Sequence, residues 1–202
     1  MTNNSADQLK AGWWARNVSP MNSLLRMMLG IVWTIDGILK FYSGFAGSFL
    51  SNLQNTQAAA PSWLSGWFTF WVNATSPNPT AVVYTVGVFE ILLGVALMLG
   101  FMRKIAYAGG FVLALLIWAI PEGFGGLYTI TPQTTDIGTG ILYAFAMMGL
   151  ILINAAHGTS RWSLDYYIER RFPGWARIAE YSTPLFGSGK PAAPSTPKTP
   201  TA

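Results

Sequence analysis

Four long apolar stretches, separated by more polar connections, are the clearest pattern in the sequence. They run from about Met21 to Ser43, from Thr80 to Met102, from Lys104 to Ile120 and from Thr135 to Ala156. Each is close to the roughly 20 residues that an α-helix needs to cross about 30 Å of hydrocarbon. The pattern therefore predicts an all-α fold, a four-helix transmembrane bundle that occupies residues 21–156.

The connection from Gly44 to Pro79 is long and carries large apolar side chains at helical spacing. These residues are Trp63, Leu64, Trp67, Phe68, Phe70 and Trp71. Such spacing is typical of a short amphipathic helix that lies on a membrane surface or caps the end of a bundle. We therefore expect an outer amphipathic segment in this connection.

The two ends of the chain differ from the bundle and from each other. Residues 1–20 form a polar N-terminal arm, which we expect to be cytoplasmic. Residues 157–182 mix aromatic and aliphatic side chains with arginines and acids, which predicts an inner interfacial helix interrupted at Pro173-Gly174. Residues 183–202 are rich in Pro, Ala and Thr and too poor in hydrophobic residues to fold, so they are predicted to be disordered.

Basic residues are distributed in a way that predicts the orientation of the bundle. Lysine and arginine are absent from 44–102 and from 105–160, whereas Arg103 and Lys104 lie in the short second connection. Other basic residues precede the first stretch or follow the fourth: Lys10, Arg16, Arg161, Arg170, Arg171 and Arg177. Because basic loops stay in the cytoplasm, both termini are predicted to be cytoplasmic. The net charge of +4 then reflects topology, and the expected partner is a lipid bilayer and no nucleic acid.

Composition agrees with a membrane protein and limits the chemistry. Hydrophobic residues make up 51% of the chain and charged residues 10%, against about 25% charged in soluble domains. There is no cysteine and a single histidine, His157, so disulfides and thiolate metal sites are excluded. A haem or metal centre needs more ligands than one histidine. No metal is therefore expected on this chain alone, and a redox cofactor would be organic or held by a partner.

Acidic residues within or beside the apolar stretches are Asp36, Glu90, Glu122 and Asp136. At 1.5 Å per residue, Asp36 lies roughly 10 Å and Glu90 about 15 Å below the outer ends of their helices. Lys40 is one helical turn from Asp36 and shares its face. Because an ionised side chain that faces lipid costs several kcal/mol, we expect these residues to share a chamber in the outer half of the bundle.

This chamber is the predicted active site, with Asp36, Lys40, Glu90 and Glu122 as candidate catalytic residues. Carboxylates in a low-dielectric site can exchange protons near the working pH. Structural roles stay open for each of them: an ion pair for Asp36 with Lys40, a protonated core residue at Glu90, and a solvated loop acid at Glu122. Asp136 is a candidate for cofactor binding and also for capping the first turn of the fourth helix.

Other side chains extend this picture. Trp33, Tyr84 and Tyr128 could line a pocket for a flat ring, although aromatic belts at the membrane interfaces explain them equally well. Gly87, Gly94 and Gly100 are predicted to allow close helix packing rather than to bind a ligand. The inner half of the bundle has only basic residues, which we expect at its periphery.

Several runs of this sequence are similar to a known family. Residues 26–41, 89–100, 118–126 and 135–140 resemble the DoxX/DoxD family of small four-helix membrane proteins, and the likeness extends over roughly 21–156. Members of the family include the DoxD subunit of thiosulfate:quinone oxidoreductase, which works with a second subunit at the outer face of the plasma membrane. The resemblance implies electron transfer from a small sulfur oxyanion, or another donor, to membrane quinone, and a partner subunit.

Three functions remain as hypotheses at this point. The first, which we favour, is a subunit of a quinone-linked oxidoreductase whose outward chamber holds the quinone ring. The second is a non-catalytic subunit that anchors or assembles a larger membrane complex through its aromatic outer connection and basic tail. The third is a small transporter or channel, against which the lack of charges in the inner half argues, because it leaves no continuous polar route.

Overall fold

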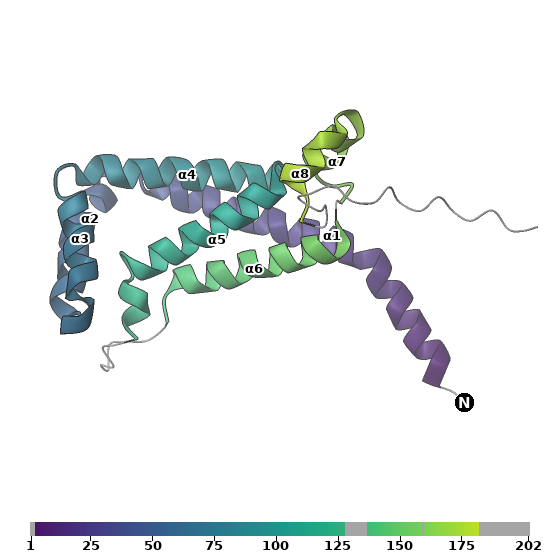
Figure 1. Cartoon of the computed structure of the whole chain (residues 1–202), viewed down its shortest axis with the longest axis horizontal. Coiled ribbons are helices and arrows are strands. Elements are labelled where there is room, and N and C mark those ends of the chain that lie inside the picture. The colour runs from purple at the N-terminus through teal and green to yellow at the C-terminus, as the bar shows by residue number, and fades with distance from the viewer. Residues whose placement is uncertain (1–2, 128–136, 159, 182–202) are drawn as a thin grey trace, which may run out of the picture.

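The computed structural model describes residues 3–127, 137–158 and 160–181, and every regular element within them is a helix (Figure 1). The longer helices are α1 Asn3–Leu39, α2 Ser43–Ala59, α3 Ser65–Thr75, α4 Pro79–Leu99, α5 Arg103–Ala119 and α6 Thr139–His157. The shorter ones are η1 Ser62–Leu64, η2 Gly123–Gly126, α7 Leu164–Arg171, η3 Pro173–Trp175 and α8 Ala176–Ala179. The predicted all-α class is confirmed.

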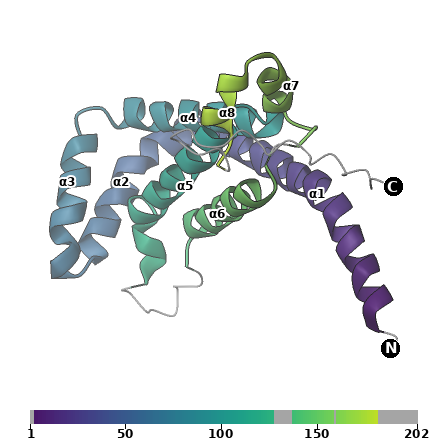
Figure 2. The ribbon, with the colours of Figure 1, turned by 45° about the vertical axis from the view of Figure 1, so that its right-hand side comes forward.

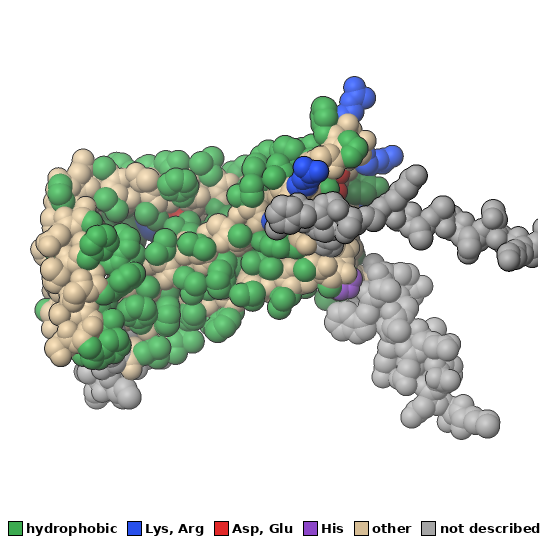
Figure 3. Space-filling view, in the orientation of Figure 1, with side chains coloured by type: hydrophobic (Ala, Val, Ile, Leu, Met, Phe, Trp, Pro, Cys, Tyr) green, Lys and Arg blue, Asp and Glu red, His purple; other side chains and the backbone are tan. Residues whose placement is uncertain are grey.

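Long apolar helices make this a multi-pass membrane protein. Among the described residues, 17–39, 79–99 and 139–157 are long and apolar enough to cross a bilayer. The third predicted span is α5, which has 17 residues and lies beside α6. In Figure 3 hydrophobic side chains cover the body of the bundle, and basic side chains gather at the end that carries α7 and α8. Such an apolar exterior suits lipid rather than water.

The bundle is built from two helix pairs, α1 with α4 and α5 with α6. Glycines allow α1 and α4 to pack closely. A Cβ on Gly30 would lie 2.7 Å from the Gly94 carbonyl oxygen, and a Cβ on Gly37 would lie 2.7 Å from the Gly87 carbonyl oxygen. Small residues facing each other let two membrane helices approach at backbone distance. The predicted packing role is therefore confirmed for Gly87 and Gly94, whereas Gly100 ends α4 in a left-handed conformation with a φ of 65°.

A hairpin of α2 and α3 lies across one end of the bundle, roughly perpendicular to the long helices (Figures 1 and 2). We expected one short amphipathic helix here, and the structure has two. Pro61 separates them, because it follows the extended Ala60 and cannot continue α2. Leu53, Phe68 and Val72 form the buried core between the two helices. The hairpin thus caps the end where the acidic side chains were predicted.

At the opposite end α7 and α8 pack on the turn between α4 and α5 (Figure 1). Ser163 starts α7, because its hydroxyl accepts the Tyr166 amide proton at 3.3 Å. The predicted interruption at Pro173-Gly174 coincides with η3, which separates α7 from α8. The C-terminal segment is therefore folded against the bundle rather than lying on a membrane surface as a single helix.

Candidate functional site

A cavity of about 480 Å³ lies between the two helix pairs, at the end covered by the α2–α3 hairpin. Five of the predicted site residues line this cavity. Four have ionisable side chains, namely Asp36, Lys40, Glu90 and Glu122, and the fifth is Trp33. In Figure 3 acidic and basic side chains are visible through an opening in the hydrophobic surface near this end. The structure thus brings the candidate catalytic residues to one chamber.

The α1–α4 glycine contact determines the first charge pair. Lys40 lies three residues after Gly37, and Glu90 lies three residues after Gly87, so the close approach of the glycines brings the two side chains together. The Lys40 Nζ is 3.2 Å from Oε2 of Glu90, whose side chain is 1% exposed. Because the ammonium and Oε2 of Glu90 do not have the geometry of a hydrogen bond, the attraction between the two side chains is mainly ionic. Lys40 therefore neutralises Glu90.

Asp36 has a different partner from the one that sequence spacing suggested. Its backbone carbonyl oxygen lies 3.4 Å from the Lys40 ammonium, but its carboxylate accepts a hydrogen bond from the Tyr143 hydroxyl at 3.1 Å. Tyr143 comes from α6 and its ring contacts that of Trp33, with centroids 5.4 Å apart. Sequence analysis missed Tyr143, because a tyrosine in an apolar helix carries no signal of its partner. Asp36 is thus held by a hydroxyl from α6 rather than by the Lys40 ammonium.

Glu122 caps a helix. Its carboxylate oxygens lie 2.9 and 3.2 Å from the amide nitrogen of Gly140, in the first turn of α6. A carboxylate at this position satisfies a free N–H group and interacts favourably with the helix dipole. Gly138 makes room for it, since a Cβ there would lie 2.6 Å from the carboxylate. This is the capping role that we considered for Asp136, which lies outside the described residues.

The aromatic candidates divide into three groups. Trp33 lines the chamber, and so does Trp71 from α3, which we had assigned to the outer segment. Tyr84 does not line it, since its ring stacks on Phe41 with centroids 4.9 Å apart. Tyr128 lies outside the described residues. The indole N–H groups of Trp33 and Trp71 are buried and have no hydrogen-bond partner in the described part of the chain.

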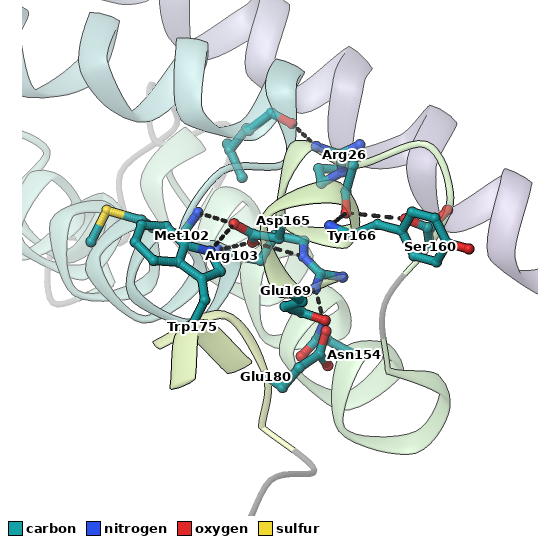
Figure 4. A network of polar contacts seen from close by, with 12 residues as sticks. Arg26, Met102, Arg103, Asn154, Ser160, Asp165, Tyr166, Glu169, Trp175 and Glu180 are labelled. Carbon is teal, nitrogen blue, oxygen red and sulfur yellow. Dashed lines mark hydrogen bonds and ion pairs between the residues drawn. The ribbon is translucent and has the colours of Figure 1, made fainter. Parts of the chain in front are cut away.

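A second polar cluster lies at the opposite end of the bundle (Figure 4). Asp165, which is fully buried, accepts hydrogen bonds from the Met102 and Arg103 amides, from Nε of Arg103 at 3.0 Å and from the Trp175 indole at 2.8 Å. The Arg103 guanidinium also bonds Glu169 and Glu180. This network ties the C-terminal segment to the α4–α5 turn.

The expectation that the inner basic residues are peripheral is wrong for two of them. Arg26 is 1% exposed and Arg103 is 2% exposed. Arg26 donates to the carbonyl oxygens of Leu97 and Trp162, which join α4 to the chain before α7. Nearby, burial raises the pKa of the Tyr181 phenol, whose hydroxyl donates to the Lys104 carbonyl oxygen at 2.7 Å. The cluster holds backbone groups and buried acids of its own segment, so its role is structural.

Comparison with known proteins gave one match. The model of a family described as DoxX matches residues 21–123, about half of the chain. That range contains α2 to α5, most of α1, and all the candidate catalytic residues. No curated protein and no solved structure matches the chain.

Proposed function

Because the chain belongs to the DoxX family of membrane proteins, we propose that it is the membrane subunit of a quinone-linked oxidoreductase. It passes electrons from a small external donor, such as thiosulfate, to membrane quinone. One observation carries this proposal: Asp36, Lys40 and Glu90 line the same cavity within a hydrophobic bundle. Charged groups at such a depth are costly and are typically kept for function.

The chamber has the size and lining that a quinone ring needs. Ligand cavities usually measure about 300–1,000 Å³, with apolar walls and few polar groups, and this one measures about 480 Å³. Trp33, Trp71 and Tyr143 supply flat walls for a ring. When bound, a quinone accepts two electrons and two protons.

Access from the bilayer also supports an apolar ligand. Leu113 and Leu116 line the chamber, and they also line a groove on the outside of the bundle between α4 and α5. These two apolar side chains thus border both the chamber and the groove. A lipid-soluble molecule therefore has a short apolar path to it.

The residues of the chamber have distinct tasks in this proposal. Asp36 holds and delivers protons at its carboxylate, and the Tyr143 hydroxyl positions that carboxylate at 3.1 Å. Lys40 keeps a positive charge beside Glu90 and so holds that buried carboxylate in the chamber. Glu122 holds the start of α6 in place. Because the chain lacks cysteine and has one histidine, electrons enter through a partner subunit.

The proposal includes four spans, with both termini on the cytoplasmic side of the plasma membrane. Its support is the position of the basic residues at the α7–α8 end (Figure 3). Since the natural chain has no cysteine, single cysteines placed at Ser62 and Arg170 would give a direct test with a membrane-impermeant thiol reagent. Labelling of Ser62→Cys alone in intact cells supports the orientation, and labelling of Arg170→Cys alone reverses it.

Quinone content and turnover test the main proposal. Protein purified in mild detergent should retain quinone, measured by mass spectrometry of a solvent extract, and should support donor-dependent quinone reduction once its partner is supplied. Asp36→Asn and Glu90→Gln should lower turnover at least about tenfold, as loss of a proton-transfer group does. Tyr84→Phe, outside the chamber, is the control. Absence of quinone together with absence of reduction would refute the proposal.

A second candidate function is a non-catalytic anchoring or assembly subunit. The observation that favours it is the exposed aromatic surface of the outer hairpin, where Trp63 is 75% exposed and Phe70 is 61% exposed. Exposed aromatic side chains are typical of interfaces with protein or lipid. In this case Glu90→Gln would leave the activity of the complex intact, whereas replacing Trp63 and Phe70 with serine would prevent its assembly.

A further inference from the structure

A long apolar groove runs along the outside of the bundle between α4 and α5, separate from the chamber. Its volume is about 1080 Å³, and its walls are aliphatic and aromatic side chains of both helices. Helix α5 approaches α4 near α8 and lies farther from it toward the hairpin (Figures 1 and 2). The groove extends from Leu116 to Lys104, about 18 Å at 1.5 Å per residue. This length matches one leaflet of a bilayer core about 30 Å thick.

Two adjacent glycines on α5 show how the groove stays open. A Cβ on Gly110 would lie 3.1 Å from side chains of Leu93 and Met147, so the glycine allows tight helix packing there. A Cβ on Gly109 would meet nothing within 4 Å, although a glycine within a helix costs about 1 kcal/mol relative to alanine. Gly109 lines the groove and leaves room along its floor.

The groove has basic groups at the end near α8 and none at the other end. Lys104 and Arg177 line it there. The Lys104 ammonium donates to the Arg177 carbonyl oxygen at 3.3 Å, which leaves two of its three donors for another acceptor. In the described C-terminal segment the acids Asp165, Glu169 and Glu180 all bond Arg103. No carboxylate of the described residues therefore neutralises Lys104 or Arg177.

We infer that this groove binds an anionic phospholipid. The phosphate of the headgroup lies between Lys104 and Arg177, and an acyl chain follows the groove past Gly109 toward Leu116. The charges select this occupant over a partner helix, because a basic pocket between membrane helices at the level of the headgroups is suited to anionic lipid. An apolar chain alone would leave Lys104 and Arg177 without an anion to pair with. The inference does not depend on the proposed redox function.

Native mass spectrometry of the detergent-purified full chain tests the inference. The probes are phosphatidylglycerol and phosphatidylcholine with identical acyl chains, titrated against the wild-type protein. We expect the first phosphatidylglycerol to bind about tenfold more tightly than phosphatidylcholine, since each basic residue adds attraction at the headgroup level. The double variant Lys104→Gln/Arg177→Gln should lose this preference, whereas Gly109→Leu should reduce binding of both lipids.

Matched controls separate the site from general effects. The double variant Arg161→Gln/Arg171→Gln removes the same charge from exposed positions outside the groove and should keep the preference. Gly149→Leu adds the same side chain to an open position on α6 outside the groove and should bind lipid normally. If Gly109→Leu fails to fold, the charge variants still decide the question.

Three results would overturn the inference. One is equal affinity of the wild-type protein for the two lipids. Another is an equal loss of preference in both double variants, which would reveal a general effect of net charge. The third is a dimer in the native spectra that Gly109→Leu abolishes, because a second copy of the chain would then occupy the groove.

Discussion

Removing Lys40 tests how the chamber holds its charges. In Lys40→Met the 1% exposed Glu90 loses the ammonium that lies 3.2 Å from its Oε2. At that separation and an effective dielectric constant of about 20, the Coulomb attraction is about 5 kcal/mol. Loss of one partner of a buried pair typically costs 3–5 kcal/mol. Because the Lys40 side chain is 17% exposed and partly screened, we expect the variant to be destabilised by about 3 kcal/mol.

The assay is equilibrium unfolding in mixed micelles, followed by the fluorescence of the tryptophans. The double variant Lys40→Met/Glu90→Gln should recover most of the loss, because it removes both charges and leaves no unpaired carboxylate. Arg171→Met is the control, since it replaces an exposed cation and should change stability by less than about 0.5 kcal/mol.

A small effect would refute the reasoning. If Lys40→Met costs less than about 1 kcal/mol, the pair behaves like an exposed surface ion pair. If the double variant is no more stable than Lys40→Met, the two charges are not coupled. Either result would mean that Lys40 is not the partner that neutralises Glu90 in the folded protein.

Three further predictions concern other parts of the molecule and use the same unfolding assay. Arg103→Met should cost about 3–5 kcal/mol, because it leaves the fully buried Asp165 without its cation, and full stability would contradict the network in Figure 4. Gly94→Leu should cost at least about 3 kcal/mol by forcing α1 away from α4, whereas Gly149→Leu, in open space, should not. Tyr143→Phe should cost about 1.5–3 kcal/mol through its lost hydrogen bond to a carboxylate, and it should slow quinone reduction without loss of retained quinone.

The location of the chamber was predictable from the sequence, but its pairings were not. Hydrocarbon penalises an ionised side chain in any fold, so Asp36 and Glu90 had to face the bundle interior. Helical spacing put Lys40 next to Asp36, yet its ammonium pairs with Glu90. The contact between Gly37 and Gly87 determines that choice, and a register between two helices cannot be derived from either helix alone.

The inner network was beyond sequence reasoning for a related reason. Asp165 lies in a segment that mixes charged and aromatic residues, and the same pattern describes a helix on a membrane surface. Its burial depends on the α4–α5 turn, where Gly100 has a φ of 65° and presents its carbonyl oxygen to the Asp165 amide at 3.1 Å. The capping of α6 by Glu122 is similar, because its partner Gly140 lies across a loop. The partner of a polar group that lies far away in the sequence can be identified only when the fold is known.

A single feature of the packing accounts for both the chamber and the outer groove. Glycine contacts keep α1 against α4 at two levels, Gly30 with Gly94 and Gly37 with Gly87, so this pair cannot open. Helix α5 instead contacts α4 beside Leu93 through Gly110 and diverges from it toward the hairpin, and its partner α6 follows it (Figure 1). The divergence that results leaves space on both sides of α5: polar groups of α1, α4 and α6 reach the inner side, and the outer side is the apolar groove. The two sites that we propose thus have one origin, an unequal glycine content at two helix interfaces.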